Sequence, residues 1–165
     1  MSTVVLRTFE VYQKARVQFV QTVAELSKRK ENFEALQSAG TYPPKTNLIS
    51  LGALLLLKPL LLDNVPSVAQ TACIAIGRMA SESADIAESV IGLDILPQIV
   101  YSIAEQNRFF KKCAAYVLRA IAKHNAELAQ AVVDADGLTA LSKILTEFDP
   151  SVKEAGCWAI SYIAK

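Results

Sequence analysis

The sequence has few of the residues that mark catalytic, metal-binding or disulfide-stabilised proteins. It contains three cysteines and one histidine in 165 residues, and no two cysteines stand at a metal-ligand spacing such as C-x-x-C. The phosphate-binding G-x-x-x-x-G-K-[ST], the dinucleotide-binding G-x-G-x-x-G and the nucleophile-elbow G-x-S-x-G motifs do not occur. We therefore expect no enzyme activity, no cofactor and no metal site. The cysteines are interpreted as small buried thiols in a reducing compartment.

Net charge and long apolar runs are also scarce. The formal net charge is +1, without a long Lys or Arg run, which excludes the strongly basic class of nucleic-acid binders. The most apolar stretch, residues 48–62, is interrupted by Lys58 and Pro59 and is shorter than a bilayer span. The first residues lack the apolar core of a signal peptide. We expect a cytoplasmic protein without nucleic-acid or membrane partners.

Glycine and proline are few, six of each, whereas 52% of the residues are hydrophobic. This composition excludes the disordered class and suits packed helices in one domain. The dominant signal is a repeat of 42 residues, with copies that begin at Pro66, Arg108 and Pro150. Apolar residues recur within each copy at the spacing of an amphipathic helix. The aligned apolar columns are Val68, Phe110 and Val152, then Ile76, Leu118 and Ile160, then Met79, Ile121 and Ile163. A column of small residues comprises Ala72, Ala114 and Gly156.

Each repeat unit is predicted to contain a short, a medium and a long helix. The short helices are expected at 84–92 and 126–135, the medium ones at 53–62, 95–105 and 138–147, and the long ones at 67–80, 108–123 and 150–165. Three helices in about 42 residues are typical of the armadillo repeat, whereas HEAT repeats have two. The sequence thus predicts an all-α armadillo-repeat right-handed superhelix, an α-solenoid of about three repeats behind an N-terminal helix.

Residues at the predicted helix borders support this division. Asp149 and Asn107 are expected to cap the N-termini of long helices, and Pro150 suits a first helical turn. Pro66 occupies the same place in the first copy, although Val65 before it is a poor cap. Gly137 is expected to end a short helix.

The chain is divided into residues 1–40, which hold an N-terminal helix and the start of the first repeat, an inserted loop at 41–52, and repeats at 53–165. Residues 4–30 are predicted to be a helix that caps the first repeat, and 32–40 a short helix. The apolar face of the N-terminal helix is predicted to comprise Val5, Phe9, Tyr12, Ala15, Phe19, Val23 and Leu26. The segment 41–52 has two prolines and no periodicity, and retained non-coding sequence is an alternative explanation for it. No polar capping repeat follows Lys165, so we expect a truncated array whose exposed end self-associates.

Three segments resemble one protein family beyond the apolar columns: FEVYQKARVQFVQTVAEL (9–26), ILPQIVYSIAEQNRFFKKCAAYVLRAIAKHNAELAQAVVDADGL (95–138) and EFDPSVKEAGCWAISYIAK (147–165). They resemble the sperm-associated antigen 6 family, armadillo proteins of the axonemal central apparatus of motile cilia and flagella. The resemblance implies a scaffold protein of the central-pair microtubules that acts in flagellar beating, with axonemal proteins as partners. It also implies about eight repeats in the whole protein, of which this chain would be the N-terminal third. Residues 41–52 depart from the family pattern.

Armadillo proteins bind partners in the groove lined by their long helices. Importin-type members use a Trp and an Asn four residues later, but the Asn-like column here is Arg78, Ala120 and Tyr162, which argues against import cargo. The candidate groove residues are Gln70, Arg78, Lys112, Tyr116, Arg119, Trp158 and Tyr162. The alternative is that Tyr116 and Trp158 are packing residues and that Arg78 and Lys112 are solvated.

A second candidate surface is a basic patch of Arg108, Lys111 and Lys112, joined by Arg119, which could face the acidic surface of tubulin. Cations are disfavoured near a helix start, so a binding role would explain their position. The leading hypothesis is therefore a scaffold of the flagellar or ciliary axoneme. The alternative is a soluble armadillo adaptor that binds extended peptides of transport or signalling partners in its groove.

Overall fold

The computed structural model describes residues 3–28 and 48–165, and every regular element in these ranges is helical. The predicted short helix at 32–40 and loop residues 41–47 lie outside them. The described elements, in chain order, are α1 (Thr3–Leu26), α3 (Leu48–Leu57), the 3-10 helix η1 (Lys58–Leu62), α4 (Pro66–Glu82), α5 (Ala84–Gly92), α6 (Ile95–Glu105), α7 (Arg108–Ala122), α8 (Ala126–Asp134), α9 (Gly137–Leu145) and α10 (Pro150–Ile163). The predicted short, medium and long helices from residue 84 onward are confirmed to within two residues at each border.

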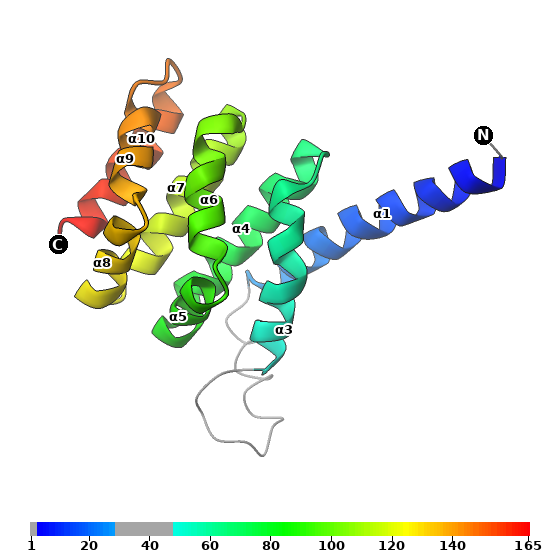
Figure 1. Cartoon of the computed structure of the whole chain (residues 1–165), viewed down its shortest axis with the longest axis horizontal. Coiled ribbons are helices and arrows are strands. Elements are labelled where there is room, and N and C mark those ends of the chain that lie inside the picture. The colour runs from blue at the N-terminus through cyan, green and yellow to red at the C-terminus, as the bar shows by residue number, and fades with distance from the viewer. Residues whose placement is uncertain (1–2, 29–47) are drawn as a thin grey trace.

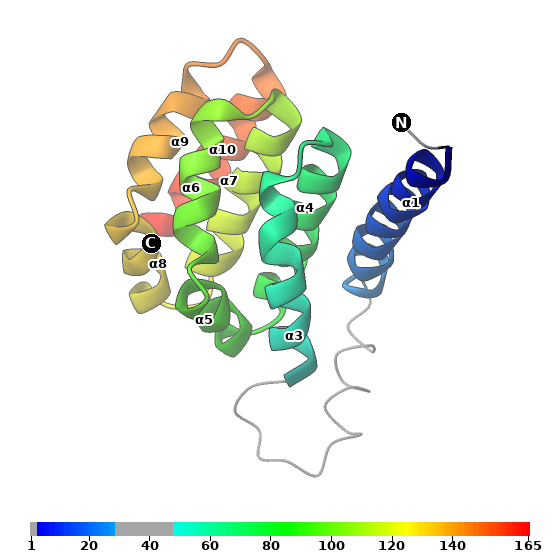
Figure 2. The same cartoon turned by 45° about the vertical axis from the view of Figure 1, so that its right-hand side comes forward.

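The repeats stack side by side in two layers (Figures 1 and 2). The long helices α4, α7 and α10 form one layer, in which α7 packs between the other two. The medium helices α3, α6 and α9 form the second layer, and the short helices α5 and α8 close one end of each unit. Three helices per unit are therefore confirmed for the units α5–α6–α7 and α8–α9–α10.

Apolar side chains of the predicted columns form the core between the layers. Val68, Phe110 and Val152 are fully buried, and so are Ile76 and Leu118. Each such side chain contributes about 1.5–3 kcal/mol of transfer free energy relative to its exposed state. The column of small residues is also buried, which lets adjacent helices approach closely. Leu138 is 39% exposed, although Leu54 and Leu96 at the same place in the earlier repeats are buried. Among the described medium helices, only α6 packs against α9.

Side-chain caps begin the helices as predicted for the two later repeats. Oδ1 of Asn107 accepts from the backbone N–H groups of Phe109 and Phe110 at 3.0 and 3.1 Å. Oδ1 of Asp149 accepts from Ser151 N at 2.9 Å. Val65 provides no side-chain cap for α4, as expected. These bonds satisfy backbone donors that the first turn of a helix leaves without partners.

The turn between short and medium helices differs from the prediction. The short helix α8 ends at Asp134, and Gly137 is instead the first residue of α9. The left-handed residue is Asp136, with φ of 61°, and Asp94 has the same role in the preceding repeat. A short polar side chain tolerates this conformation. Gly137 is required for space, since a Cβ there would lie 2.6 Å from the carbonyl oxygen of Val132.

Helix α1 packs on α4 through its second half. Arg16 pairs with Asp63, just before α4, and Arg78 near the other end of α4 donates to the carbonyl of Ala24. The two helices therefore run in the same direction, and α1 occupies a long-helix position. Its first half extends beyond α4, as Figure 1 shows.

The predicted apolar face of α1 is confirmed at Phe19 and Val23, which pack against the core, and is wrong in two respects. The most buried residues are Val20, Ala24 and Ser27, one position along the helix from the predicted set. Phe9 and Tyr12 are each 57% exposed, because the first half of α1 extends past the helix against which it would pack.

The predicted insertion at 41–52 also needs correction. Helix α3 begins at Leu48, so the last five residues of that segment are helical. This part of the sequence, LISLG, has no proline and continues directly into the apolar run of the medium helix, so only the modest helix-propensity cost of Gly52 opposes helix formation.

Candidate protein-binding groove

Four of the seven predicted groove residues line one cleft between neighbouring long helices. Lys112, Tyr116 and Arg119 come from α7 and Trp158 from α10, and the cleft has a volume of about 230 Å³. Their spacing of three or four residues places the α7 side chains on one helix face. The structure adds three lining residues that sequence reasoning missed, namely Ser151, Glu154 and Ala155. Their helical spacing from Trp158 was the signal that could have identified them.

The other three predicted residues lie outside this cleft. Gln70 donates its side-chain amide to Oδ1 of Asn107 at 3.1 Å, and thereby connects the starts of α4 and α7. Arg78 is engaged with the last turn of α1. Tyr162 borders the cleft through Arg119, whose guanidinium lies 6.0 Å from the Tyr162 ring centroid.

Aromatic rings and cations alternate along the cleft. The Arg119 guanidinium lies 5.3 Å from the centroid of the Tyr116 ring, a cation–π arrangement that holds both side chains in place. Trp158 is 52% exposed, so about half of its surface lies outside the packed core. Tyr116 is half-buried. A binding role for either aromatic side chain stays a prediction.

A glycine on the neighbouring helix makes room for Tyr116. A Cβ at Gly77 of α4 would lie 2.6 Å from Cδ1 and 2.7 Å from Cε1 of the Tyr116 ring. Real Cβ atoms do not approach so closely, so the position of the Tyr116 ring depends on the absent side chain of Gly77.

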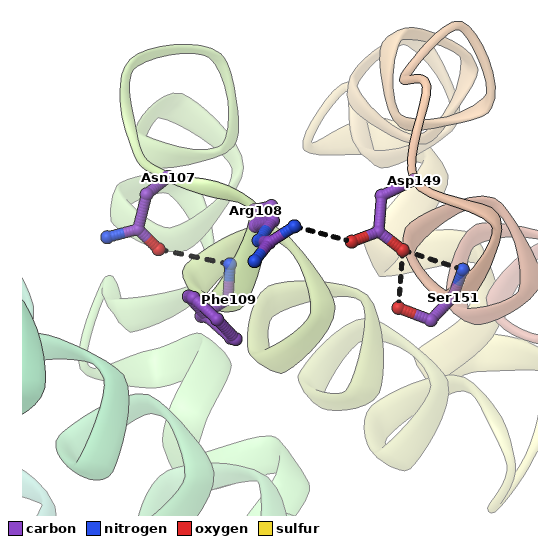
Figure 3. Close-up of polar contacts among 5 residues, drawn as sticks. All are labelled: Asn107, Arg108, Phe109, Asp149 and Ser151. Carbon is purple, nitrogen blue, oxygen red and sulfur yellow. Dashed lines mark hydrogen bonds and ion pairs between the residues drawn. The ribbon is translucent and has the colours of Figure 1, made fainter.

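The predicted basic patch divides between two environments. Nη1 of Arg108 lies 3.3 Å from Oδ2 of Asp149 (Figure 3), and Lys111 pairs with Glu147. Both bonds join α7 to the following repeat. These ion pairs give a structural reason for cations near the start of a helix. Because Arg108 and Lys111 are paired, the patch has less unpaired positive charge than the sequence suggests. Lys112 points instead into the cleft. A role of the patch at tubulin stays a prediction.

Other titratable groups act between repeats or within the core. The single histidine, His124, follows the C-terminal end of α7, and its Nε2 lies 2.7 Å from the carbonyl oxygen of Ala80 near the C-terminal end of α4. Burial raises the pKa of the Cys113 thiol to about 11 and that of Cys73 well above its ordinary value, whereas Cys157 is exposed. High thiol pKa values are unfavourable for nucleophilic chemistry.

Three further observations concern the described residues alone. They contain no group of three His, Cys, Asp or Glu side chains that could hold a metal ion. None of their helices is by itself long and apolar enough to cross a membrane, although α5 and α6, bent by 74°, meet the length and composition criteria as a pair. A larger hollow of about 1020 Å³ lies beside α1 and is lined by Phe9, Tyr12, Arg16 and Val65, among others. It lies between the projecting helix α1 and residues 64–65 before α4, whereas the α7–α10 cleft lies between two packed helices and is the better-defined site.

Comparisons with known proteins agree with this architecture. The family model for the Armadillo/beta-catenin-like repeat matches residues 125–165. Mouse sperm-associated antigen 6 is 56% identical over 110 residues, and the human protein is 55% identical over the same length. Each alignment covers 67% of this chain but 19% of the relative, so the chain aligns with about a fifth of these relatives.

Solved structures show the same fold. A designed armadillo repeat protein superimposes with a TM-score of 0.74 at 23% identity, over 90% of this chain and 58% of that one. Another designed armadillo repeat protein, in complex with peptide (KR)4, gives 0.69 at 25% identity, over 87% of this chain and 63% of that one. The fold is thus that of an armadillo-repeat solenoid, a fold that generally serves as a non-catalytic scaffold for protein binding.

Proposed function

Because the chain belongs to the sperm-associated antigen 6 family of armadillo-repeat proteins, we propose that it is a scaffold of the flagellar or ciliary axoneme. It would act in the central apparatus, through protein–protein contacts needed for motility. The observation that carries the proposal is the high identity to relatives named for their association with sperm. Axonemal proteins, and tubulin as an acidic surface, are the proposed partners.

The form of the molecule supports a binding role. The long helices α4, α7 and α10 stack side by side in one layer (Figure 1). The half-exposed Trp158 on α10 is of the residue type that anchors interfaces. The cleft beside it is lined by aromatic, cationic and acidic side chains. Such a surface suits recognition of another chain.

A second candidate function is a soluble adaptor that binds extended peptides in the groove. The α7–α10 cleft is the observation that favours it. The column that holds asparagine in import receptors contains Arg78, Ala120 and Tyr162, of which Ala120 is buried and Arg78 is bonded to α1. Those side chains cannot form an asparagine ladder, so the adaptor would recognise its peptide mainly through side chains.

Self-association through the end of the solenoid is a further proposal. Phe148, which follows α9, is fully exposed, and Leu138 in the first turn of α9 is 39% exposed. A second copy or a following repeat would remove these apolar surfaces from water.

Localisation of a tagged full-length protein in a flagellated cell tests the primary proposal. Axonemal signal that survives detergent extraction would support it. The variants K111E and K112E should be compared separately, since Lys111 is ion-paired and Lys112 faces the cleft. If K112E alone weakens retention, the groove mediates it, and if both variants do, the basic patch does. Diffuse signal would remove the axonemal proposal and favour the adaptor.

A further inference from the structure

The four cations of α7 fall into two structural sets. Arg108 and Lys111 are neutralised by Asp149 and Glu147 of the following repeat. Among the described residues, no carboxylate oxygen lies within 4.0 Å of a charged nitrogen of the other two, Lys112 and Arg119. Neighbours in sequence thus differ in role: Lys111 stabilises the contact between repeats, whereas Lys112 keeps its charge available in the cleft.

The cleft around these cations is basic and aromatic. Lys112 and Arg119 are its two cationic lining residues, and Glu154 is its one carboxylate. The half-exposed indole of Trp158 and the Tyr116 ring supply apolar surface between them. The remaining polar side chain, Ser151, already donates its hydroxyl to Asp149 at 2.7 Å. The groups that remain to contact a ligand are therefore cations beside aromatic rings.

We infer that the α7–α10 cleft binds an extended acidic peptide that carries an apolar side chain. This inference rests on the proposed role of the protein as a binding scaffold. Lys112 and Arg119 contact carboxylates of the peptide, and Trp158 packs on its apolar residue. Charge-assisted hydrogen bonds to such cations are about twice as strong as neutral ones. A basic peptide would bring like charges to Lys112 and Arg119 and is disfavoured.

Fluorescence anisotropy with two labelled peptides of about ten residues tests the charge preference. One contains Asp and Glu around a central Phe, and the other contains Lys and Arg around the same Phe. The acidic peptide should bind the 165-residue protein, more weakly as the salt rises from about 0.05 to about 0.3 M, because salt screens the contact. Equal or tighter binding of the basic peptide would overturn the inference.

Adjacent lysines provide a matched control. K112Q and K111Q remove the same charge from the same helix, so they change the net charge of the protein equally. Loss of one charge-assisted contact should weaken binding by about tenfold in K112Q. K111Q should change it less than about twofold. Equal effects of the two variants would mean that the peptide responds to net charge alone and would overturn the site.

Trp158 provides an independent readout. W158A should weaken binding of the Phe-containing acidic peptide. It should leave binding of a matched acidic peptide, with Ala in place of Phe, nearly unchanged. Circular dichroism of each variant verifies the fold. If neither peptide binds while axonemal localisation holds, the inference fails and the scaffold proposal stands. If the acidic peptide binds while localisation is diffuse, the scaffold proposal fails and the groove chemistry stands.

Discussion

Asp149 and Arg108 join two consecutive repeats through one carboxylate. Oδ2 of Asp149 lies 3.3 Å from Nη1 of Arg108 in α7, while Oδ1 accepts from the backbone N–H of Ser151 at 2.9 Å and caps α10 (Figure 3). The same side chain therefore caps the start of α10 and connects it to the start of α7.

Substitution of Asp149 should separate these two roles. D149A removes both cap and ion pair and should lower Tm by about 2–4 °C, the effect of losing a typical N-cap in a domain of this size. D149N keeps a good capping residue and should stay close to the wild type near neutral pH, because the ion pair is solvent-screened. Thermal unfolding monitored by circular dichroism measures both. Equal losses in the two variants would mean that the ion pair, not the cap, is decisive.

The same carboxylate predicts a pH dependence of stability. Hydrogen bonds from Ser151, with a smaller contribution from Arg108, hold the pKa of Asp149 below its ordinary value of 3.8. The unfolded chain binds the proton more readily, so this contribution is complete above pH 3.8 and is lost as pH falls through the lowered folded pKa. D149N should therefore lose less stability than the wild type between about pH 6 and about pH 3. Parallel curves would contradict this assignment.

Two adjacent phenylalanines offer a test of the core. Phe110 is fully buried, whereas Phe109 is 54% exposed. Cζ of Arg108 lies 4.8 Å from the centroid of the Phe109 ring. F110A should cost about 3–5 kcal/mol of unfolding free energy, since it leaves a cavity. F109A should cost less than about 1 kcal/mol. Urea denaturation measures both, and similar costs would show that the register of α7 is wrong.

Gly77 does not line the cleft, but it should fix the position of the Tyr116 ring that does. In G77A the new Cβ would overlap the Tyr116 ring, and overpacking of this kind costs about 1–3 kcal/mol despite the better helix propensity of Ala. G92A is the control, because a Cβ at Gly92 in α5 meets no atom within 4 Å. We expect G77A, but not G92A, to destabilise the protein and to change its near-ultraviolet circular dichroism. An unchanged spectrum in a destabilised G77A would indicate that Tyr116 keeps its position.

The three thiols should react in a fixed order. Cys157 is exposed, Cys113 is half-buried with a pKa of about 11, and Cys73 is buried. At about pH 8 only about one Cys113 thiol in a thousand is ionised, and the thiolate is the reactive form. Mass spectrometry after maleimide labelling should show Cys157 modified first, Cys113 slowly and faster as pH rises, and Cys73 only on unfolding. Rapid labelling of Cys113 near neutral pH would contradict its burial.

Local sequence signals account for the parts of the fold that were predicted correctly. The apolar period of the segments from residue 84 onward, and caps such as Asn107 and Asp149, depend on residues within a few positions of each other. They can therefore be predicted from the sequence alone. The predicted cleft residues Lys112, Tyr116 and Arg119 follow the same helical spacing.

Where the prediction was wrong, a distant or missing neighbour decided the outcome. The face of α1 depends on where α4 begins, and Phe9 is exposed because no described element covers it. The helical start at Leu48 was hidden by the prolines that precede it in the predicted insertion. Gly137 marks a close contact with Val132 rather than a helix end.

The sequence by itself determined the class of fold, the 42-residue unit and the helix borders from residue 84 onward, because these follow from periodicity and from the chemistry of single turns. Only the tertiary structure decided which charged side chains form ion pairs within the protein. Lys111 and Lys112 are identical neighbours in the sequence, yet the rotation of α7 by about 100° from one residue to the next directs one to Glu147 and the other into the cleft. That difference depends on where the adjacent repeat places its carboxylates.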